Sequence, residues 1–241
     1  QCLRFRTDNQ AAKALVEAGY LGDTYYAEAG AMRRRGVPEW GLFHIREHSG
    51  GGPVLDIGVH ALDTVLWLIG SPRVVSVSGA TYARIATQDE GLRKSQADSG
   101  APEGVSEPRR YDYREFDVED LGVGFLRLEN GTTITLRASW AANIPDGTGS
   151  TYILGTRAGL ALNPVRLTGT LGPYQADTLP IIPGADEPFV IGHMRQAAHM
   201  LRAIRGEDEL LVQRGEVLNV IRALEGLYRS AALGREVWLD R

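Results

Sequence analysis

The feature that most constrains the fold is a pair of alternating segments joined by a turn dipeptide, "EDLGVGFLRLENGTTITLRASW" at residues 119–140. Apolar and polar residues alternate on both sides of Asn130-Gly131, and a period of two is typical of a strand with one buried face. Asn-Gly is the preferred pair for a tight hairpin turn with positive φ at both positions. We therefore predict two antiparallel strands that belong to a sheet covered on one face.

Further segments have strand or helix patterns. Strands are predicted in "QCLRFR", "DTYYAEAG", "RVVSVSGATYARI", "STYILGT", "LALNP", "RLTGT" and "REVWL". Helices are predicted in "TDNQAAKALVEAG", at residues 53–69, in "GHMRQAAHMLRAIRG" and in "RGEVLNVIRALEGLYRSAALG". In the first helix Thr7 or Asp8 can cap the start and Gly19 can end it. The last helix has a heptad-like row, Val217, Ile221, Leu224 and Tyr228.

The order of these elements predicts the fold class. Hairpins dominate over β-α-β units, so the sheet should be largely antiparallel with helices on one side. We predict an α+β fold, with a large, mostly antiparallel open β-sheet and helices packed on one face. The other face would then need cover from a second domain or a second subunit.

Residues 86–115, "ATQDEGLRKSQADSGAPEGVSEPRRYDYRE", are the least core-like part of the chain. They contain few aliphatic and many charged or small residues. We interpret them as a loop excursion, with a linker between two domains as the alternative.

Charge and cysteine content exclude several classes of protein. The net charge of −4 favours neither nucleic acid nor anionic lipid as a partner. The single cysteine, Cys2, fits a reducing compartment, so we expect a cytoplasmic protein. No apolar stretch reaches the roughly 18 residues that span a bilayer. Because Gln1 is not a start methionine, we expect the chain to be part of a longer polypeptide.

The helix at residues 53–69 carries the strongest chemical signal. On a 3.6-residue period, Asp56 and His60 share one stripe with Asp63 and Trp67, beside a buried stripe of Leu55, Val59, Leu62, Leu66 and Ile69. A neighbouring carboxylate raises the proton affinity of an imidazole and orients it, as a general acid or base requires. The glycines at 50–52 would let backbone and substrate approach closely. An Asp–His pair on a solvated helix face is the alternative.

One other pattern resembles a catalytic motif. His44-Ile45-Arg46-Glu47-His48 matches the H-x-x-E-H pattern of a zinc peptidase, but the glycines at 50–52 break any helix that would aim the ligands. We therefore predict no metal site. The sequence also has no complete dinucleotide-binding fingerprint and no P-loop.

Several segments together resemble one family. "GGGPVLDIGVHALDTVLWLIGSPRVVSVSG" is similar to the signature segment of the glucose–fructose oxidoreductase, inositol dehydrogenase and MocA family, whose members carry Asp-x-x-x-His in such a glycine-led helix. The similarity continues through "RRRGVPEWG", "VEDLGVGFLRLENGTTITLRASWAAN" and "SAALGREV". It covers nearly the whole chain and is weakest over residues 86–115.

This resemblance implies a domain organisation. Residues 1–241 would be the C-terminal substrate-binding and oligomerisation domain, and an upstream Rossmann domain would be missing from the chain. The missing domain would bind most of the NAD or NADP and would supply a catalytic lysine, so no cofactor-binding residue is assigned here. The open sheet face would form a homo-oligomer.

The resemblance also implies a reaction. The family transfers hydride between a nicotinamide cofactor and a hydroxyl-bearing carbon, usually of a sugar or a cyclitol such as inositol. His60 would exchange a proton with the reacting oxygen, and Asp56 would orient His60 and bind a neighbouring hydroxyl. For substrate contacts we predict Arg33, with a solvated charge cluster as the alternative, and Trp40, with a packed loop anchor as the alternative.

Two points stay open at this level. His44 and His48 are not family features, so they are either surface residues or local determinants of specificity. The second class of function is a non-enzymatic oligomerisation or binding module of the same fold.

Overall fold

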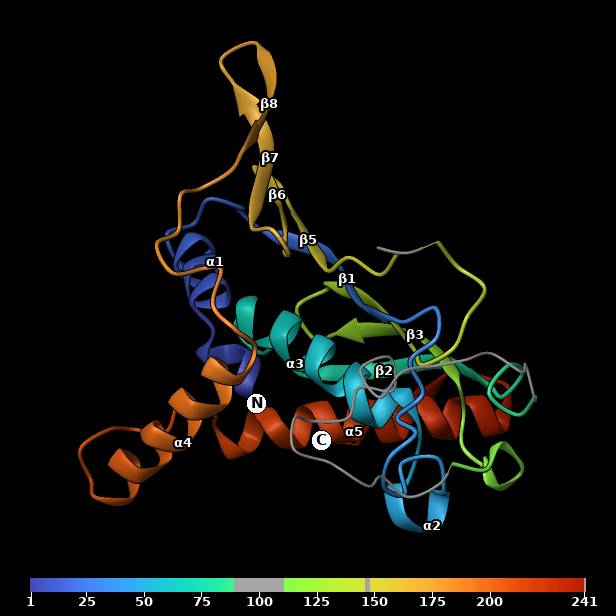
Figure 1. Ribbon diagram of the computed structural model, residues 1–241. Helices are drawn as coiled ribbons and strands as arrows, with labels where there is room; N and C mark the ends of the chain where they lie inside the picture. Colours follow the sequence, from blue (N-terminus) through green and yellow to red (C-terminus); the bar gives the residue numbers. More distant parts are fainter. Residues whose placement is uncertain (89–110, 146–147, 241) are drawn as a thin grey trace.

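A computed structural model of the chain describes residues 1–88, 111–145 and 148–240. Its centre is a nine-stranded sheet in the order β8-β7-β6-β5-β1-β4-β3-β2-β9, with α3 and α5 lying along one face (Figure 1). The strands are β1 (Thr24–Met32), β2 (Val74–Tyr82), β3 (Leu121–Leu128), β4 (Thr133–Ser139), β5 (Tyr152–Gly155), β6 (Ala158–Ala161), β7 (Arg166–Leu171), β8 (Tyr174–Thr178) and β9 (Val237–Trp238). Neighbouring strands are antiparallel except β1 and β4. The predicted α+β fold is confirmed.

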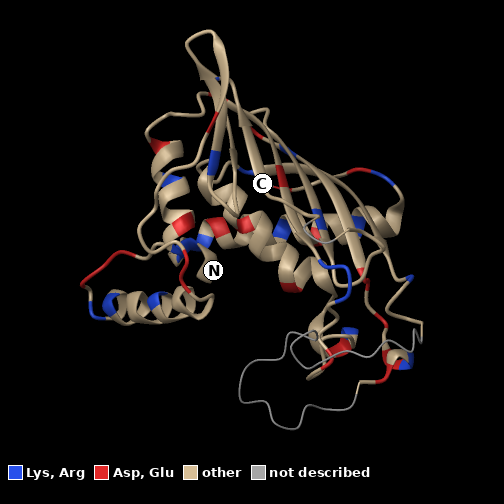
Figure 2. Ribbon diagram, turned by 45° about the horizontal axis from the view of Figure 1, so that its top comes forward, with Lys and Arg blue, Asp and Glu red and all other residues tan. Residues whose placement is uncertain are grey.

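The helical segments lie at the two ends of the chain, between β1 and β2, and between β2 and β3. They are η1 (Cys2–Phe5), α1 (Thr7–Glu17), α2 (Arg46–Ser49), the π-helical turn η2 (Val54–Gly58), α3 (Val59–Leu68), η3 (Tyr113–Glu115), α4 (Val190–Ile204) and α5 (Arg214–Leu233). No helix in the described ranges combines the length and apolar character needed to cross a membrane. Helix α4 stands apart from the sheet (Figure 2).

The predicted hairpin is confirmed, although its turn differs from the prediction. The Leu128 amide donates to the Thr132 carbonyl at 2.9 Å and the Gly131 amide donates to the Leu128 carbonyl at 3.0 Å. Only Gly131 has a positive φ, at 87°. The loop therefore has three residues, a type I turn followed by a left-handed glycine, and the Asn130 side chain accepts from the Thr132 amide.

The main hydrophobic core lies between the sheet and helices α3 and α5. Leu227 of α5 packs where β2 and β3 have glycines: a Cβ at Gly79 or Gly124 would lie 2.7 Å from Leu227 side-chain atoms. The predicted heptad row of α5 is only partly right, because Leu224 is buried while Ile221 is 46% exposed. The helix faces the sheet through Val220, Ala223, Leu224 and Leu227.

Two local predictions are wrong, and one strand was not predicted. The segment "QCLRFR" is a 3₁₀ helix, because Arg4 points inward to a charged partner instead of alternating across a sheet. Helix α1 has no side-chain cap from Thr7 or Asp8; the Thr7 hydroxyl donates to Glu187 at 2.9 Å instead. Strand β8 lacks the alternating apolar pattern and was not predicted.

Most of the predicted loop excursion, residues 89–110, lies outside the described residues. The strands that flank it, β2 and β3, are antiparallel neighbours in the same sheet. Asp120 fixes the start of the excursion, since one carboxylate oxygen accepts from the amides of Arg84, Ile85 and Ala86 at 2.6–2.9 Å.

Candidate active site

Asp56 and His60 line one pocket with a volume of about 390 Å³. Both residues are half-buried, and they come from consecutive turns of the same helical segment. The other lining residues are Leu42, Phe43, His48, Ser49, Gly51, Leu55 and Val59. The sequence spacing therefore predicted correctly that the carboxylate and the imidazole share one accessible face.

The helix that carries the pair begins in the π-helical turn η2. A π turn holds one residue more than an α turn, so a single 3.6-residue period does not run through the whole segment. Leu62 and Leu66 are buried as predicted, but Leu55 and Val59 are only half-buried and line the pocket. The π turn therefore places two apolar side chains, Leu55 and Val59, at the pocket, although the 3.6-residue period assigned them to the core.

The glycines before the helix allow close approach of backbone, as predicted, and their approach to substrate stays a prediction. A Cβ at Gly52 would overlap the backbone oxygen of Glu119, and a Cβ at Gly51 would overlap the hydroxyl of Tyr228. These two glycines therefore allow close approach of the protein's own atoms. They fix where the helix starts relative to β3 and α5.

Glu119 holds the start of this helix. Its carboxylate oxygen Oε1 accepts from the amides of Gly52 at 2.9 Å and Val54 at 3.2 Å, and from the Tyr228 hydroxyl at 2.7 Å. Burial, with the nearby Glu119 charge, raises the pKa of Tyr228, so its hydroxyl stays protonated and donates. No local pattern marks Glu119 or Tyr228 as site residues, because Glu119 lies 67 residues from Gly52 and Tyr228 lies 109 residues from Glu119.

Asp56 is held by an indole. The Trp140 side chain is fully buried, and its Nε1 donates to Asp56 Oδ2 at 2.9 Å. Trp140 directly follows β4, so the sheet positions the carboxylate. The sequence pattern placed Trp140 only at the end of a predicted strand and did not link it to the site.

The surroundings of His60 lower the pKa of its imidazole. Burial lowers the pKa of His60 below the ordinary 6.5, and the charges of Asp56 and Asp63 offset this only in part. Its Nδ1 is buried without a hydrogen-bond partner among the described residues. The Asp56 charge does raise the pKa of His60, as predicted, but burial outweighs it and the net shift is downward. At neutral pH the ring is uncharged and able to accept a proton.

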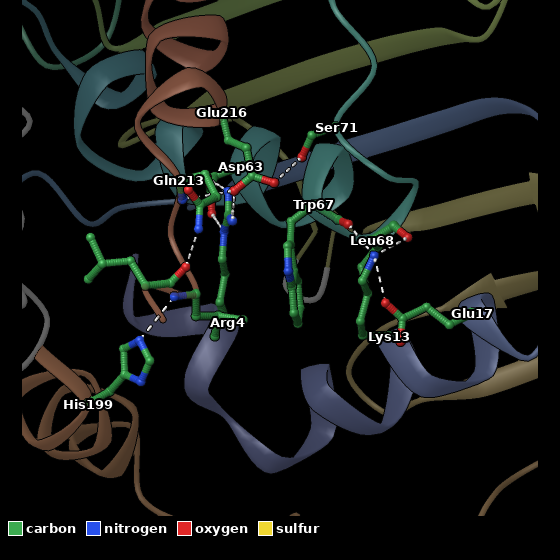
Figure 3. Close-up of polar contacts among 12 residues, drawn as sticks. Arg4, Lys13, Glu17, Asp63, Trp67, Leu68, Ser71, His199, Gln213 and Glu216 are labelled. Carbon is green, nitrogen blue, oxygen red and sulfur yellow. Dashed lines mark hydrogen bonds and ion pairs between the residues drawn. The ribbon is translucent and has the colours of Figure 1, made fainter. Parts of the chain in front are cut away.

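The rest of the predicted polar stripe faces the protein interior. Figure 3 shows Arg4 reaching from η1 to Asp63 on α3 and to Glu216 at the start of α5. Arg4 Nε and Nη2 donate to the two Asp63 oxygens at 2.9 and 2.7 Å, and the Arg4 side chain is fully buried. Trp67 is also buried, with Lys13 donating to its carbonyl at 2.9 Å. Asp63 and Trp67 therefore anchor α3 and do not line the pocket.

Arg33 and Trp40 are not among the residues that line the pocket. Arg33 Nη1 donates to the Gly36 carbonyl at 3.0 Å. The Trp40 ring packs edge-on against Phe43 with centroids 4.8 Å apart, and Phe43 does line the pocket. The predicted substrate contacts of both residues stay predictions.

His44 and His48 have different surroundings. His44 is 1% exposed and packs edge-on against Tyr111, with ring centroids 4.9 Å apart, so it is not a surface residue. His48 is exposed and lines the pocket. Over the described ranges, no group of three or more His, Cys, Asp or Glu residues could hold a metal ion.

The fold is that of known oxidoreductases. An oxidoreductase domain protein from Kribbella flavida superposes with a TM-score of 0.76 at 17% identity, covering 100% of this chain and 66% of that one. Levoglucosan dehydrogenase in complex with NADH and levoglucosan superposes with a TM-score of 0.75 at 15% identity, covering 100% and 65%. At these identities the likeness shows the fold alone.

Sequence comparison gives the family. Residues 9–161 match the GFO/IDH/MocA C-terminal domain, so the chain belongs to the GFO/IDH/MocA family. It is 31% identical over 238 residues to D-glucoside 3-dehydrogenase of Escherichia coli strain K12, an alignment that covers 98% of this chain and 62% of that protein. The chain thus spans less than two thirds of that relative.

Proposed function

We propose that the chain is the substrate-binding part of an NAD(P)-dependent oxidoreductase that transfers hydride between nicotinamide and a hydroxyl-bearing carbon of a sugar or cyclitol. The observation that carries this proposal is the pocket in which Asp56 and a neutral His60 lie side by side. The E. coli relative is named a D-glucoside 3-dehydrogenase. Levoglucosan dehydrogenase, which shares the fold, was solved with NADH and a sugar ligand.

The residues of this chain would perform the proton transfer. In the oxidation direction, His60 accepts the proton of the reacting hydroxyl, because burial keeps the ring uncharged. Asp56, fixed by Trp140, accepts a hydrogen bond from a neighbouring hydroxyl and stabilises the protonated ring electrostatically. The nicotinamide, when bound, accepts the hydride. In the reduction direction the protonated ring returns its proton to the oxygen.

The polar side chains of the pocket fit such a reaction. Asp56 and His60 can exchange hydrogen bonds with a hydroxyl, and His48 and Ser49 add two further polar side chains to the lining. We propose that a Rossmann domain outside this chain binds most of the NAD or NADP. We also propose a homo-oligomer formed through the open sheet face, and a cytoplasmic location.

The test is a screen of polyols, aldoses and glycosides with NAD and NADP on the full-length protein, followed by nicotinamide absorbance. We expect turnover of at least one sugar or polyol. General acid–base catalysis contributes about 10²–10⁴-fold, so His60→Ala should lower kcat by that order. Asp56→Asn should also lower kcat, since the amide keeps the shape and removes the charge. Full activity in His60→Ala would contradict the mechanism, and no turnover of any substrate would favour the non-enzymatic module.

A further inference from the structure

We propose that His48 is a specificity-determining residue, whose imidazole binds a substrate hydroxyl other than the one that reacts at His60. This inference rests on the proposed function and deepens it by assigning a residue that selects the substrate. It follows from the position of His48 at the pocket, from the contacts that fix it there, and from the partners of the other polar side chains in the lining.

His48 reaches the pocket from a different element than Asp56 and His60. Those two residues lie on the helical segment formed by η2 and α3, whereas His48 and Ser49 end the one-turn helix α2. A substrate in the pocket would therefore contact polar side chains from two separate elements. Contacts from two elements restrict the orientation of a bound ligand more than one contact does.

The segment that carries His48 is held at both ends. At its start, the Arg46 amide donates to Asp117 Oδ1 at 2.6 Å. At its end, Gly51 lies so close to the Tyr228 hydroxyl that a Cβ there would overlap it. His48 lies between these two contacts, so its position at the pocket is fixed before a ligand binds.

His44 provides a third anchor for the same segment. Its side chain is 1% exposed, and its ring packs edge-on against Tyr111 with centroids 4.9 Å apart. Its carbonyl accepts from the Asp117 amide at 3.2 Å. The two histidines of the H-x-x-E-H pattern therefore differ, because His44 anchors the segment and His48 faces the pocket.

The polar side chains of the lining differ in how far the protein already engages them. Trp140 holds Asp56, and the Ser49 hydroxyl donates to the Ile45 carbonyl at 3.0 Å. In the part of the chain that the structure describes, the His48 side chain makes no hydrogen bond, ion pair or ring contact. A neutral imidazole donates with one nitrogen and accepts with the other, so either can bind a hydroxyl.

The kinetic test compares His48→Leu and His48→Gln in the full-length protein, with the sugar or polyol that it turns over fastest. Leucine removes both nitrogens, and a hydrogen bond that replaces one to water changes an equilibrium constant by about 2- to 12-fold. KM should therefore rise by that factor in His48→Leu, while kcat stays nearly unchanged. Glutamine keeps a donor and an acceptor, so His48→Gln should restore most of the binding.

Glu47→Leu is the matched control for His48→Leu. Glu47 is exposed on the same helical turn and does not line the pocket, so its replacement should leave KM as it is in the wild type. An unchanged KM in His48→Leu, or an equal rise in Glu47→Leu, would overturn the proposal.

Monodeoxy analogues of the same substrate test specificity. The wild type should discriminate against the analogue that lacks the hydroxyl bound by His48, and His48→Leu should lose that discrimination and keep it at the other positions. Equal discrimination at every position in the two proteins would contradict the assignment of His48.

NMR separates failure of this inference from failure of the proposed function, because it needs no turnover. The ring resonances of His48 and His60 are assigned with His48→Gln and His60→Gln. Titration with D-glucose, methyl β-D-glucoside and myo-inositol should move both resonances for at least one compound. Movement at His60 alone would overturn this inference and keep the proposed function, while no movement at either ring would contradict both.

Discussion

At the scale of single residues, burial decides the state of His60. The fold favours the uncharged ring, because the pKa of His60 in the folded protein lies below the ordinary 6.5. The unfolded chain therefore binds more protons than the fold between these two values, and stability rises as the pH increases through this window. The same shift keeps the ring ready to accept a proton when a hydroxyl is oxidised.

Arg4 is the residue whose loss should destabilise the fold most clearly. Arg4→Met leaves Asp63 charged and 1% exposed, without its partner. Removing one member of a buried ion pair costs about 3–5 kcal/mol, so we expect a fall of that size in the free energy of unfolding. Urea denaturation followed by circular dichroism measures it.

The control for this prediction is Arg73→Met. Arg73 pairs with Glu129 at 3.3 Å, and both side chains are at least 35% exposed. Exposed pairs contribute about 0–1 kcal/mol, so this variant should unfold nearly as the wild type does. Equal losses in the two variants would show that the Arg4 cluster does not stabilise the fold.

At the scale of elements, the position of the active-site helix depends on contacts distant in sequence. Alternation and turn residues predicted β2, the β3–β4 hairpin and α5, because these elements are defined by neighbours in the chain. The spacing also brought Asp56 and His60 together. It did not predict the π turn or the contacts of Glu119 and Trp140. A pattern among neighbouring residues does not indicate which distant residue will contact the helix.

Gly52 provides the test of this positioning. A Cβ there would overlap the Glu119 backbone oxygen, so Gly52→Ala must shift either the helix start or β3. Overpacking of this kind costs about 1–3 kcal/mol, and we expect a matching loss of stability in thermal unfolding. We also expect the His60 ring resonances to move in NMR spectra, because the helix that carries His60 is displaced.

Gly215→Ala is the matched control for Gly52→Ala. Gly215 lies in the first turn of α5, and nothing lies within 4 Å of a Cβ placed there. Alanine is the better helix former, by about 1 kcal/mol at most, so this variant should be neutral or slightly stabilised. If Gly52→Ala behaves in the same way, close approach to Glu119 does not position the helix.

At the scale of the whole molecule, we propose assembly through the sheet face opposite α3 and α5. Phe125 is 36% exposed, and the Arg127 guanidinium lies 5.2 Å from its ring centroid. On β1, Glu28 pairs with Arg137 and accepts from the Tyr152 hydroxyl at 2.7 Å. Apolar and hydrogen-bonded groups on one flat face are typical of a subunit interface.

Phe125→Glu should weaken that assembly. A glutamate removes the apolar ring from the proposed interface and adds a charge that would lose water on assembly, so the sedimentation coefficient should fall toward the monomer value. Leu171→Glu is the control, because Leu171 lies at the β7–β8 turn and is already 74% exposed. A full-length wild type that stays monomeric at every concentration would contradict assembly through this face.

The most direct test of the central claim is the pH dependence of kcat/KM for sugar oxidation by the full-length protein and its His60→Ala variant. If His60 accepts the proton, the wild type should lose activity on the acid side with an apparent pKa below 6.5, because protonation blocks the base. The His60→Ala variant should be slow and should lack this acid limb. An acid limb with the same apparent pKa in both proteins would contradict the claim.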